Sequence, residues 1–319
     1  MTSSRGRSGE FDRIAAFVRH FARAQVPVGV GDDCAVLPGP SRGCELCVTT
    51  DSVVEALHFS RAAFSMEDIG HKALAVNLSD LAAMGARPSW FVCALEVPDW
   101  VDDVKLAGLA RGMSKLARGA DIALVGGNMT RAERLAITLT VAGEVPRGKA
   151  LLRKGARPGD RLYVSGTLGE ARAGLVAGAP AALVVRQLRP SPRLELGLLA
   201  RAFASACVDI SDGFAQDLGH ICDASGVGVR VNVDALPMSA TLRRFAGHRA
   251  RDFALSGGED YELILAVPPG RAHAFERAAE RSNHRVTCVG EFARSRQRRF
   301  VDDRGEAIQP PRGFDHFAP

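Results

Sequence analysis

The sequence is poor in aromatic residues and in lysine, and it has no apolar run long enough to cross a bilayer. Only 6% of its 319 residues are aromatic, whereas glycine occurs 33 times. Glycine-rich turns are therefore better candidates for close contact with a ligand than aromatic platforms. Residues 1–9 lack the apolar core of a secretory signal. We expect a soluble protein of the cytoplasm that does not enter the membrane.

The positive charge is modest and dispersed. Forty-one Lys and Arg residues against 36 Asp and Glu residues give a net charge of +5. The densest run, Arg294–Arg299, precedes a predicted strand and is typical of a solvated face. No zinc-finger spacing and no basic helix supports nucleic-acid recognition. We therefore expect no nucleic-acid partner.

Cysteine usage gives no sign of a disulfide framework or a zinc site. The seven cysteines are odd in number and irregularly spaced, which suits a reducing compartment. Cys44 and Cys47 have ligand-like spacing, but no second pair accompanies them. We interpret them as thiols of a predicted strand.

The first half of the chain alternates strand and helix patterns. A composition of 46% hydrophobic and 24% charged residues is that of a folded protein rather than a disordered one. Apolar spacing and glycine or proline breaks predict a helix over 11–21, a strand over 44–50 that ends on Asp51, a helix over 66–84 capped by Gly85, a strand over 90–96, a helix over 101–118, and strands over 121–125 and 135–141. This order predicts a mixed α/β layer structure.

The length favours two domains, and the turn-rich stretch Val145–Lys149 separates them. We predict an N-terminal domain over residues 1–146 and a C-terminal α/β domain over residues 147–319. The second half predicts strands over 161–165, 207–210, 228–233, 261–267 and 285–291, and helices over 168–177, 193–204, 212–224 and 271–281.

Acidic residues recur at predicted strand ends, in glycine-rich turns and on one helix face. The set is Asp32, Asp33, Asp51, Asp80, Asp209 and Asp212. A lone carboxylate is usually a solvated surface group, but these have apolar flanks. Asp80 lies in a helix with little other charge, with Asn77 one turn earlier on the same face. An acid so placed needs a counter-charge or a metal.

This donor set predicts magnesium and phosphoryl transfer. Several carboxylates without histidine or cysteine partners suit a hard cation, and Thr49 and Thr50 add oxygens beside Asp51. Magnesium usually joins protein carboxylates to substrate phosphates. The catalysis of phosphoryl transfer is mainly positioning and electrostatic stabilisation.

The common nucleotide-binding motifs are missing. There is no Walker loop and no protein-kinase catalytic set, and Gly29-Val-Gly31 lacks the third glycine of a dinucleotide fold. We expect phosphate contacts instead at Gly126-Gly127-Asn128, at Arg153, and at the amides of Ser211-Asp212-Gly213 that open a predicted helix. The plain alternatives are a surface arginine at 153 and a helix cap at 211.

Jointly, eight segments resemble those of the thiamine-monophosphate kinase family, in the superfamily of aminoimidazole-ribonucleotide synthetase. They follow in order along nearly the whole chain: Gly9–Phe11, Gly31–Ala35, Thr49–Asp51, His58-Phe59, Lys72–Gly85, Asp209–Gly213, Leu255–Leu263 and Gly313–Phe317. The resemblance implies a two-lobed α/β fold whose N-terminal mixed-sheet lobe pairs in a homodimer, with ATP near the dimer interface. It also implies Mg²⁺-dependent transfer of the ATP γ-phosphate to thiamine monophosphate, giving thiamine diphosphate and ADP.

The resemblance also implies roles for individual residues. The implied metal ligands are Asp33, Thr49, Thr50, Asp51, Asp80, Asn128, Asp209 and Asp212; the ATP contacts are Gly127, Asn128, Arg153 and Ser211; the substrate contacts are His58, Glu259 and Phe314; and Asp51, Asp80 and Asp209 are the acids expected to matter most for catalysis. Without the resemblance, Phe314 is a core or C-terminal anchor, Glu259 a turn acid and His58 a structural histidine.

One residue departs from the family pattern. Asn128 stands where the family has a metal-binding aspartate, so one negative charge is lost while a carbonyl oxygen remains. This predicts weaker magnesium binding. It also leaves the alternative that the protein binds these ligands without turnover. Two other enzymes of the superfamily are disfavoured, because the chain has no cysteine before Cys34, as a selenophosphate synthetase requires, and none at the C-terminus, as a hydrogenase-maturation enzyme requires.

Overall fold

The computed structural model describes residues 9–31 and 34–314, which form two compact units. The first unit takes the residues up to Arg42 together with Val48–Asn77 and Pro88–Glu144, and the second takes Gly43–Cys47, Leu78–Arg87 and the chain from Val145. Each unit is built around its own sheet, of four and of six strands. The predicted mixed α/β fold class is thereby confirmed.

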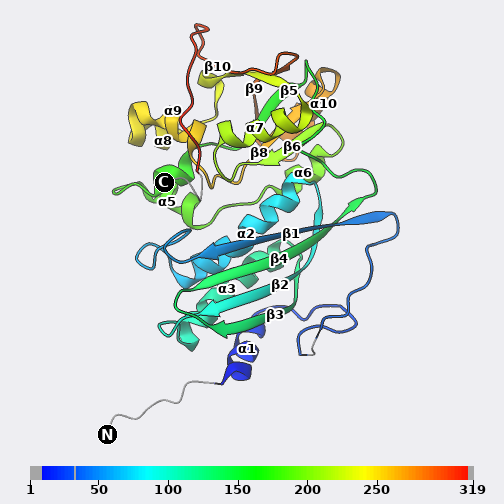
Figure 1. The fold of residues 1–319 in the computed structure, drawn as a ribbon, viewed down its shortest axis with the longest axis vertical. Helices are drawn as coiled ribbons and strands as arrows, with labels where there is room; N and C mark the ends of the chain where they lie inside the picture. Colours follow the sequence, from blue (N-terminus) through cyan, green and yellow to red (C-terminus); the bar gives the residue numbers. More distant parts are fainter. Residues whose placement is uncertain (1–8, 32–33, 315–319) are drawn as a thin grey trace. The chain divides into compact units, whose positions relative to one another are not determined.

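The first unit holds a four-stranded sheet in the order β1-β4-β2-β3. Its strands are β1 (Cys44–Val54), β2 (Arg87–Val97), β3 (Ala123–Arg131) and β4 (Ala136–Pro146). Helix α3 (Asp103–Gly119) and the first part of α2 (Met66–Ala83) cover one face of it (Figure 1). Side chains facing those helices, such as Ile137, Leu139 and Val141, are fully buried. Helix α1 (Glu10–Val18) packs against α3 and β3.

Helices α2 and α3 meet backbone to backbone at two glycines. A Cβ atom on Gly70 would lie 2.0 Å from the carbonyl oxygen of Leu109, and one on Gly112 would lie 1.9 Å from that of Glu67. Real Cβ atoms do not approach so closely, so each alanine substitution would force the helices apart. The glycines in these helices therefore set the spacing of the layer that covers the sheet.

We expect Gly112→Ala to lower the free energy of unfolding by about 1–3 kcal/mol, the usual cost of overpacking. Gly119→Ala is the matched control, because it ends the same helix with no atom within 4 Å of its added methyl group. That control is expected to leave stability unchanged or raise it slightly. Urea denaturation measures both, and equal stabilities for the two variants would refute the close helix contact.

The second unit holds a six-stranded sheet in the order β10-β7-β9-β5-β8-β6. Its strands are β5 (Arg161–Ser165), β6 (Ala206–Asp209), β7 (Gly228–Asn232), β8 (Leu263–Val267), β9 (Val286–Ala293) and β10 (Arg298–Val301). All neighbours are antiparallel except β7 and β10, which run parallel. The sheet interior is fully buried at Leu162, Val164 and Ile264.

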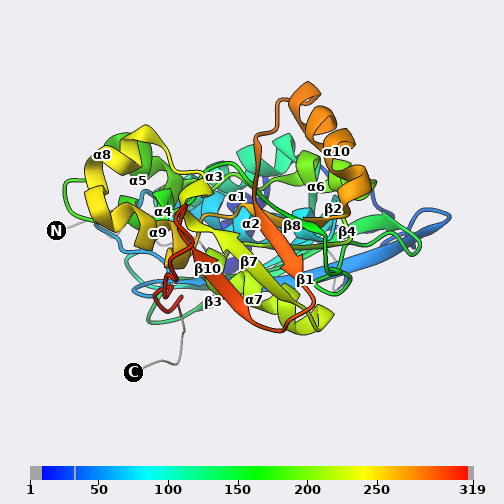
Figure 2. The ribbon, with the colours of Figure 1, turned by 90° about the horizontal axis from the view of Figure 1, so that it is seen from above.

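Seven α-helices accompany this sheet in the described residues. They are α4 (Glu170–Gly174), α5 (Ala181–Leu188), α6 (Leu194–Ala200), α7 (Phe214–Ser225), α8 (Ala240–Ala246), α9 (Ala250–Ser256) and α10 (Pro269–Arg281), with 3₁₀ turns at Val233–Ala235 and Gly247–Arg249. Helices α4, α5, α8 and α9 form one group (Figure 2). An apolar cluster that includes Leu183 of α5 and Leu242 of α8 holds this group together.

The structure corrects three predictions about local structure. Strand β1 continues to Val54, so Asp51 lies within the strand and not at its end. Strand β3 runs through Gly126-Gly127-Asn128, which were expected to follow it. Helices α5, α8 and α9 were not predicted. Within the described residues, none of the helices is long and apolar enough to span a membrane.

Candidate active site

In the second unit, the charges of Asp80 and Arg153 both act on the buried Asp209. Asp209 ends strand β6, is 5% exposed, and accepts a hydrogen bond from the Ser79 hydroxyl at 2.7 Å. Burial, followed by the negative charge of Asp80, raises the pKa of the Asp209 carboxyl, and the positive charge of Arg153 opposes this. The structure thus brings together Asp80, Asp209 and Arg153, as the sequence predicts for a phosphate and metal site.

The loop after Asp209 is held by an internal carboxylate. Asp217, in the first turn of α7, accepts hydrogen bonds from the backbone amides of Ser211, Asp212 and Gly213 at 3.0, 3.1 and 3.1 Å. Burial raises the pKa of Asp217 to about 7, although the three amides favour its charged form. The three amides at which we expected a phosphate are therefore already bonded to the Asp217 carboxyl. Asp217 is a residue that the sequence analysis missed.

Two of the predicted substrate contacts adjoin the same loop. The amide of Glu259 donates to the carbonyl of Ser211 at 2.8 Å, and the amide of Phe314 donates to the carbonyl of Asp212 at 3.0 Å. The side chain of Gln216 donates to the carbonyl of Phe314 at 3.0 Å. Phe314 is 46% exposed, so it is not a core residue, but these two bonds agree with the alternative of a C-terminal anchor. Backbone pairing therefore gathers Ser211, Asp212, Glu259 and Phe314.

In the first unit, β1 divides its three candidate ligands between two faces. Successive side chains of a strand point to opposite sides, so Thr49 and Asp51 share one face and Thr50 lies on the other. The Thr50 hydroxyl donates to the carbonyl of Leu139 at 2.9 Å and accepts from Thr140 at 3.3 Å. The hydroxyl of Thr50 thus stabilises the pairing of β1 with β4.

Gly127 and Asn128 lie on β3, at the opposite edge of the sheet from β1. Strands β4 and β2 lie between these two edges. A Cβ on Gly127 would lie 2.1 Å from the carbonyl oxygen of Cys93, which explains the glycine. Gly127 and Asn128 line a cavity of about 50 Å³ whose other walls, which include Phe17 and Met129, carry no charged side chain. The sheet therefore does not bring Asn128 beside Asp51 within one chain.

His58 is fixed in the turn after β1. Its Nδ1 atom accepts from the amide of Val54 at 3.0 Å, so the ring proton of the neutral form is on Nε2. The carbonyl of His58 accepts from Nζ of Lys72 at 3.1 Å, and Lys72 is only 1% exposed. The ammonium group also lies 5.2 Å from the centre of the Phe64 ring. This buried lysine holds the histidine turn, a role the sequence analysis did not assign.

The described residues would supply only part of the coordination of a metal ion. Asp33 lies outside them, and within them no three His, Cys, Asp or Glu side chains form a group that could hold a metal. The pair Asp80 and Asp209 has oxygen donors, and its mutual repulsion would be relieved by a cation. Magnesium is commonly held by one or two carboxylates together with waters and substrate phosphates. The residues present fit that mode of binding.

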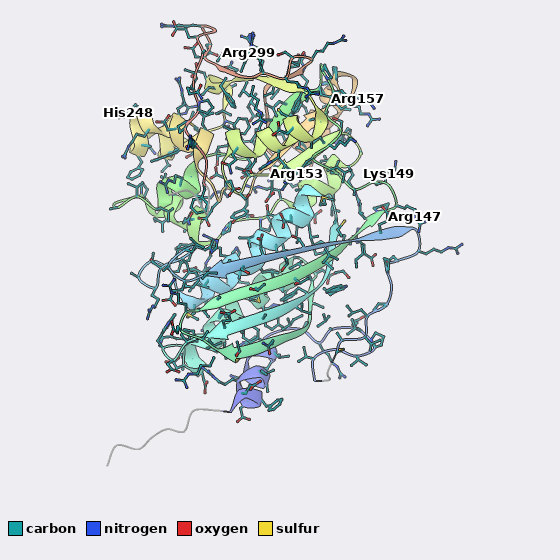
Figure 3. All side chains as sticks on the ribbon, viewed as in Figure 1. Arg147, Lys149, Arg153, Arg157, His248 and Arg299 are labelled. Carbon is teal, nitrogen blue, oxygen red and sulfur yellow. The ribbon has the colours of Figure 1, made fainter. Side chains whose placement is uncertain are left out.

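The segment that joins β4 to β5 is basic. Figure 3 shows Arg147, Lys149, Arg153 and Arg157 along it, and all four are exposed. Of these four, Arg153 is the one whose charge acts on Asp209. Arg153 is therefore an exposed arginine whose charge reaches the buried Asp209, and its contact with a phosphate stays a prediction.

Known proteins match both halves of the chain. The AIR synthase related protein N-terminal domain matches residues 31–145, and the C-terminal domain matches residues 157–303. Thiamine-monophosphate kinase of Salmonella typhimurium is 42% identical over 97% of this chain and 98% of its own. The crystal structure of thiamine-monophosphate kinase from Stenotrophomonas maltophilia K279a is 42% identical, covers 93% of this chain and 96% of that one, and has a TM-score of 0.82.

The chain belongs to the thiamine-monophosphate kinase family of AIR synthase related proteins. A further member of known structure, AaThiL complexed with AMPPCP and TMP, is 31% identical, covers 99% of this chain and 100% of that one, and has a TM-score of 0.76. The expected family and fold are confirmed.

This family member carries a third acid with a raised pKa, Asp260, which follows Glu259 in the chain. Asp260 is 4% exposed and accepts from the amides of Gly169 and Ala171 at 2.6 and 3.3 Å. Burial is the main cause that raises its pKa to about 7, from 3.8. Ionising Asp260 therefore destabilises the folded state. The stability that the protonated carboxyl provides is present at low pH and is lost as the pH rises from about 4 to about 7.

We expect Asp260→Asn to remove this pH dependence. The parent should lose up to about 1.4 kcal/mol of unfolding free energy per pH unit in that window relative to the variant, the limit for one group. Glu280→Gln is the control, because Glu280 is exposed on α10. Denaturant unfolding at a series of pH values measures the difference, and parallel curves for parent and Asp260→Asn would contradict it.

Proposed function

We propose that this member of the family transfers the γ-phosphate of ATP to thiamine monophosphate, giving thiamine diphosphate and ADP. The observation that carries the proposal is the loop Ile210–Gly213. This loop follows Asp209, which lies beside Asp80 and Arg153, and it is hydrogen-bonded to Glu259 and Phe314. One loop therefore joins the groups suited to phosphate and metal with those suited to the cationic thiazolium ring.

The proposed roles follow the chemistry of each group. Several magnesium ions, when bound, would neutralise phosphate charge; the proposed ligands, shared among these ions, are Asp33, Thr49, Thr50, Asp51, Asp80, Asn128, Asp209 and Asp212. Arg153, the Ser211 hydroxyl, Gly127 and Asn128 contact ATP. Glu259 faces the thiazolium charge, Phe314 supplies an aromatic surface, and His58 donates from Nε2 to the substrate phosphate.

The proposed reaction is a direct transfer. An oxygen of the thiamine monophosphate phosphate attacks the γ-phosphorus of ATP, and the bond between that phosphorus and the β–γ bridging oxygen breaks, leaving ADP. Asp51, Asp80 and Asp209 organise the charge around the transferred group, and Arg153 offsets the negative charge that develops on it. In this mechanism no residue of the proposed site carries the phosphoryl group as a covalent intermediate. Incubation with γ-labelled ATP tests this, since a trapped phospho-enzyme would contradict direct transfer.

We also propose that two copies pair through the sheets of their first units. Strand β1 is an edge strand of 11 residues, and Leu46 and Val48 on one of its faces are 44% and 55% exposed. A long edge strand with exposed apolar side chains is a template for association. We place the reaction in the cytoplasm, where the free cysteines remain reduced.

Asn128 should bind magnesium less tightly than an aspartate at this position, because its side chain carries no negative charge. We expect Asn128→Asp to lower the magnesium concentration for half-maximal activity by at least about fivefold, since one added charge near the cation is worth about 1 kcal/mol or more. Asn283→Asp, at an exposed turn, is the control. A magnesium titration of initial rates measures the shift, and an unchanged midpoint would show that residue 128 is not a metal ligand.

A further inference from the structure

We propose that Gln187 is a positioning residue that holds the carboxylate of Glu259 for thiamine monophosphate. Gln187 lies on α5, is 3% exposed, and donates from Nε2 to Oε2 of Glu259 at 2.5 Å. This inference deepens the proposed function and rests on it, because it assigns Glu259 to the substrate.

The backbone of Glu259 is already fixed. Its φ of 68° lies in the left-handed region, which is uncommon for a side chain other than glycine. The amides of Glu259 and Tyr261 bond to the carbonyls of Ser211 and Ile210 at 2.8 and 2.9 Å. Backbone strain of this kind persists where the surroundings over-determine it. The backbone conformation therefore fixes the direction in which the Glu259 side chain leaves the chain. The position of its carboxylate depends further on the rotatable bonds of that side chain.

Gln187 supplies that restraint from a rigid base. The preceding residue, Arg186, pairs with Glu262 at 2.8 Å and with Glu170 at 3.2 Å. Leu183, one turn earlier, is 1% exposed within the apolar cluster of α4, α5 and α8. Helix α5 is thus anchored at Leu183 and Arg186, within the turn that precedes Gln187. A site residue held by a packed and ion-paired neighbour is pre-organised for its ligand.

The other end of the Gln187 amide shows that the fold itself gains little from this side chain. Its Oε1 atom is buried and has no hydrogen-bond partner within the described residues. A buried unsatisfied acceptor costs free energy. An apolar side chain of similar length would avoid that cost, so the glutamine is explained by its bond to Glu259 and not by packing.

The test compares Gln187→Met with the parent in thiamine monophosphate kinase assays. We expect KM for thiamine monophosphate to rise about tenfold, the fold-change for loss of a hydrogen bond to a charged group. KM for ATP should stay within twofold and the melting temperature within about 2 °C. Val185→Ala, an exposed position of the same helix, is expected to change none of these.

A double-mutant cycle separates positioning from a structural role. In the Glu259→Ala background, Gln187→Met is expected to have no further effect on KM for thiamine monophosphate. Equal tenfold effects in both backgrounds, or a fall in melting temperature with both KM values unchanged, would overturn the inference. A parent without turnover of thiamine monophosphate would instead refute the proposed function, and this inference with it. A parent that turns over while Gln187→Met keeps the parental KM refutes the inference alone.

Discussion

Replacing Asp80 by asparagine is expected to lower kcat by about 10²–10³-fold without lowering the stability of the metal-free protein. The loss of rate is that of one group that stabilises charge in the transition state. The stability is expected not to fall because the same negative charge is unfavourable in the metal-free folded protein. Asp80, after burial, raises the pKa of Asp209 to about 7 by like-charge repulsion, so removing its charge relieves the folded protein as the pH rises toward that value.

Steady-state kinetics at saturating magnesium and thermal melting in a chelator measure the two effects separately. Glu67→Gln is the matched control, because Glu67 is a half-exposed acid of the same helix. Asp51→Asn should show a loss of kcat of similar size. A near-parental kcat for Asp80→Asn would remove Asp80 from the site, and a loss of rate accompanied by a large fall in melting temperature would make its role structural.

Replacing Glu262 by glutamine is expected to cost about 3 kcal/mol of unfolding free energy, the largest stability effect of any single change considered. Glu262 is fully buried and accepts hydrogen bonds from Ser165 at 2.5 Å, Arg186 at 2.8 Å and Nε of Arg193 at 2.6 Å. Removing one member of such a group leaves the other charges uncompensated. The two arginines are about one-quarter exposed, which keeps the cost at the lower end of the usual range.

Urea denaturation compares this variant with Asp223→Asn. Asp223 pairs with Arg298 but its side chain is 74% exposed, and pairs of that kind contribute less than about 1 kcal/mol. Equal losses for the two variants would show that the buried network adds nothing. Because Arg186 also anchors helix α5, we expect Glu262→Gln to raise KM for thiamine monophosphate as well.

Most helices and strands were predictable from the sequence, and the three short helices α5, α8 and α9 were not. Helix α2 was predicted because its apolar run ends at Gly85, whose φ of 63° is a left-handed helix end. Helices α5, α8 and α9 have seven or eight residues each. Helices this short are marginal alone, and these are stabilised by the apolar cluster around Leu183 and Leu242, which no local pattern reveals.

The site residues divide in the same way. Asp80, Asp209, Ser211, Asp212, Glu259 and Phe314 were indicated by motifs, and in the second unit the structure gathers them around one loop. Asp217 and Gln187 were missed because their roles depend on hydrogen bonds to that loop and to Glu259. A glutamine 72 residues from its partner gives no sequence signal. The roles of all the site residues, including Asp33, which lies outside the described residues, and Asn128, stay predictions.

The most direct test of the proposed activity is a comparison of two acceptors. Purified protein with magnesium and ATP is offered thiamine monophosphate and, separately, unphosphorylated thiamine, while ADP and thiamine diphosphate are measured. We predict thiamine diphosphate and equimolar ADP from the monophosphate, and no phosphorylated product from thiamine. Absence of turnover while calorimetry shows that ATP and thiamine monophosphate both bind would contradict the account and identify a binding protein with the fold of a kinase.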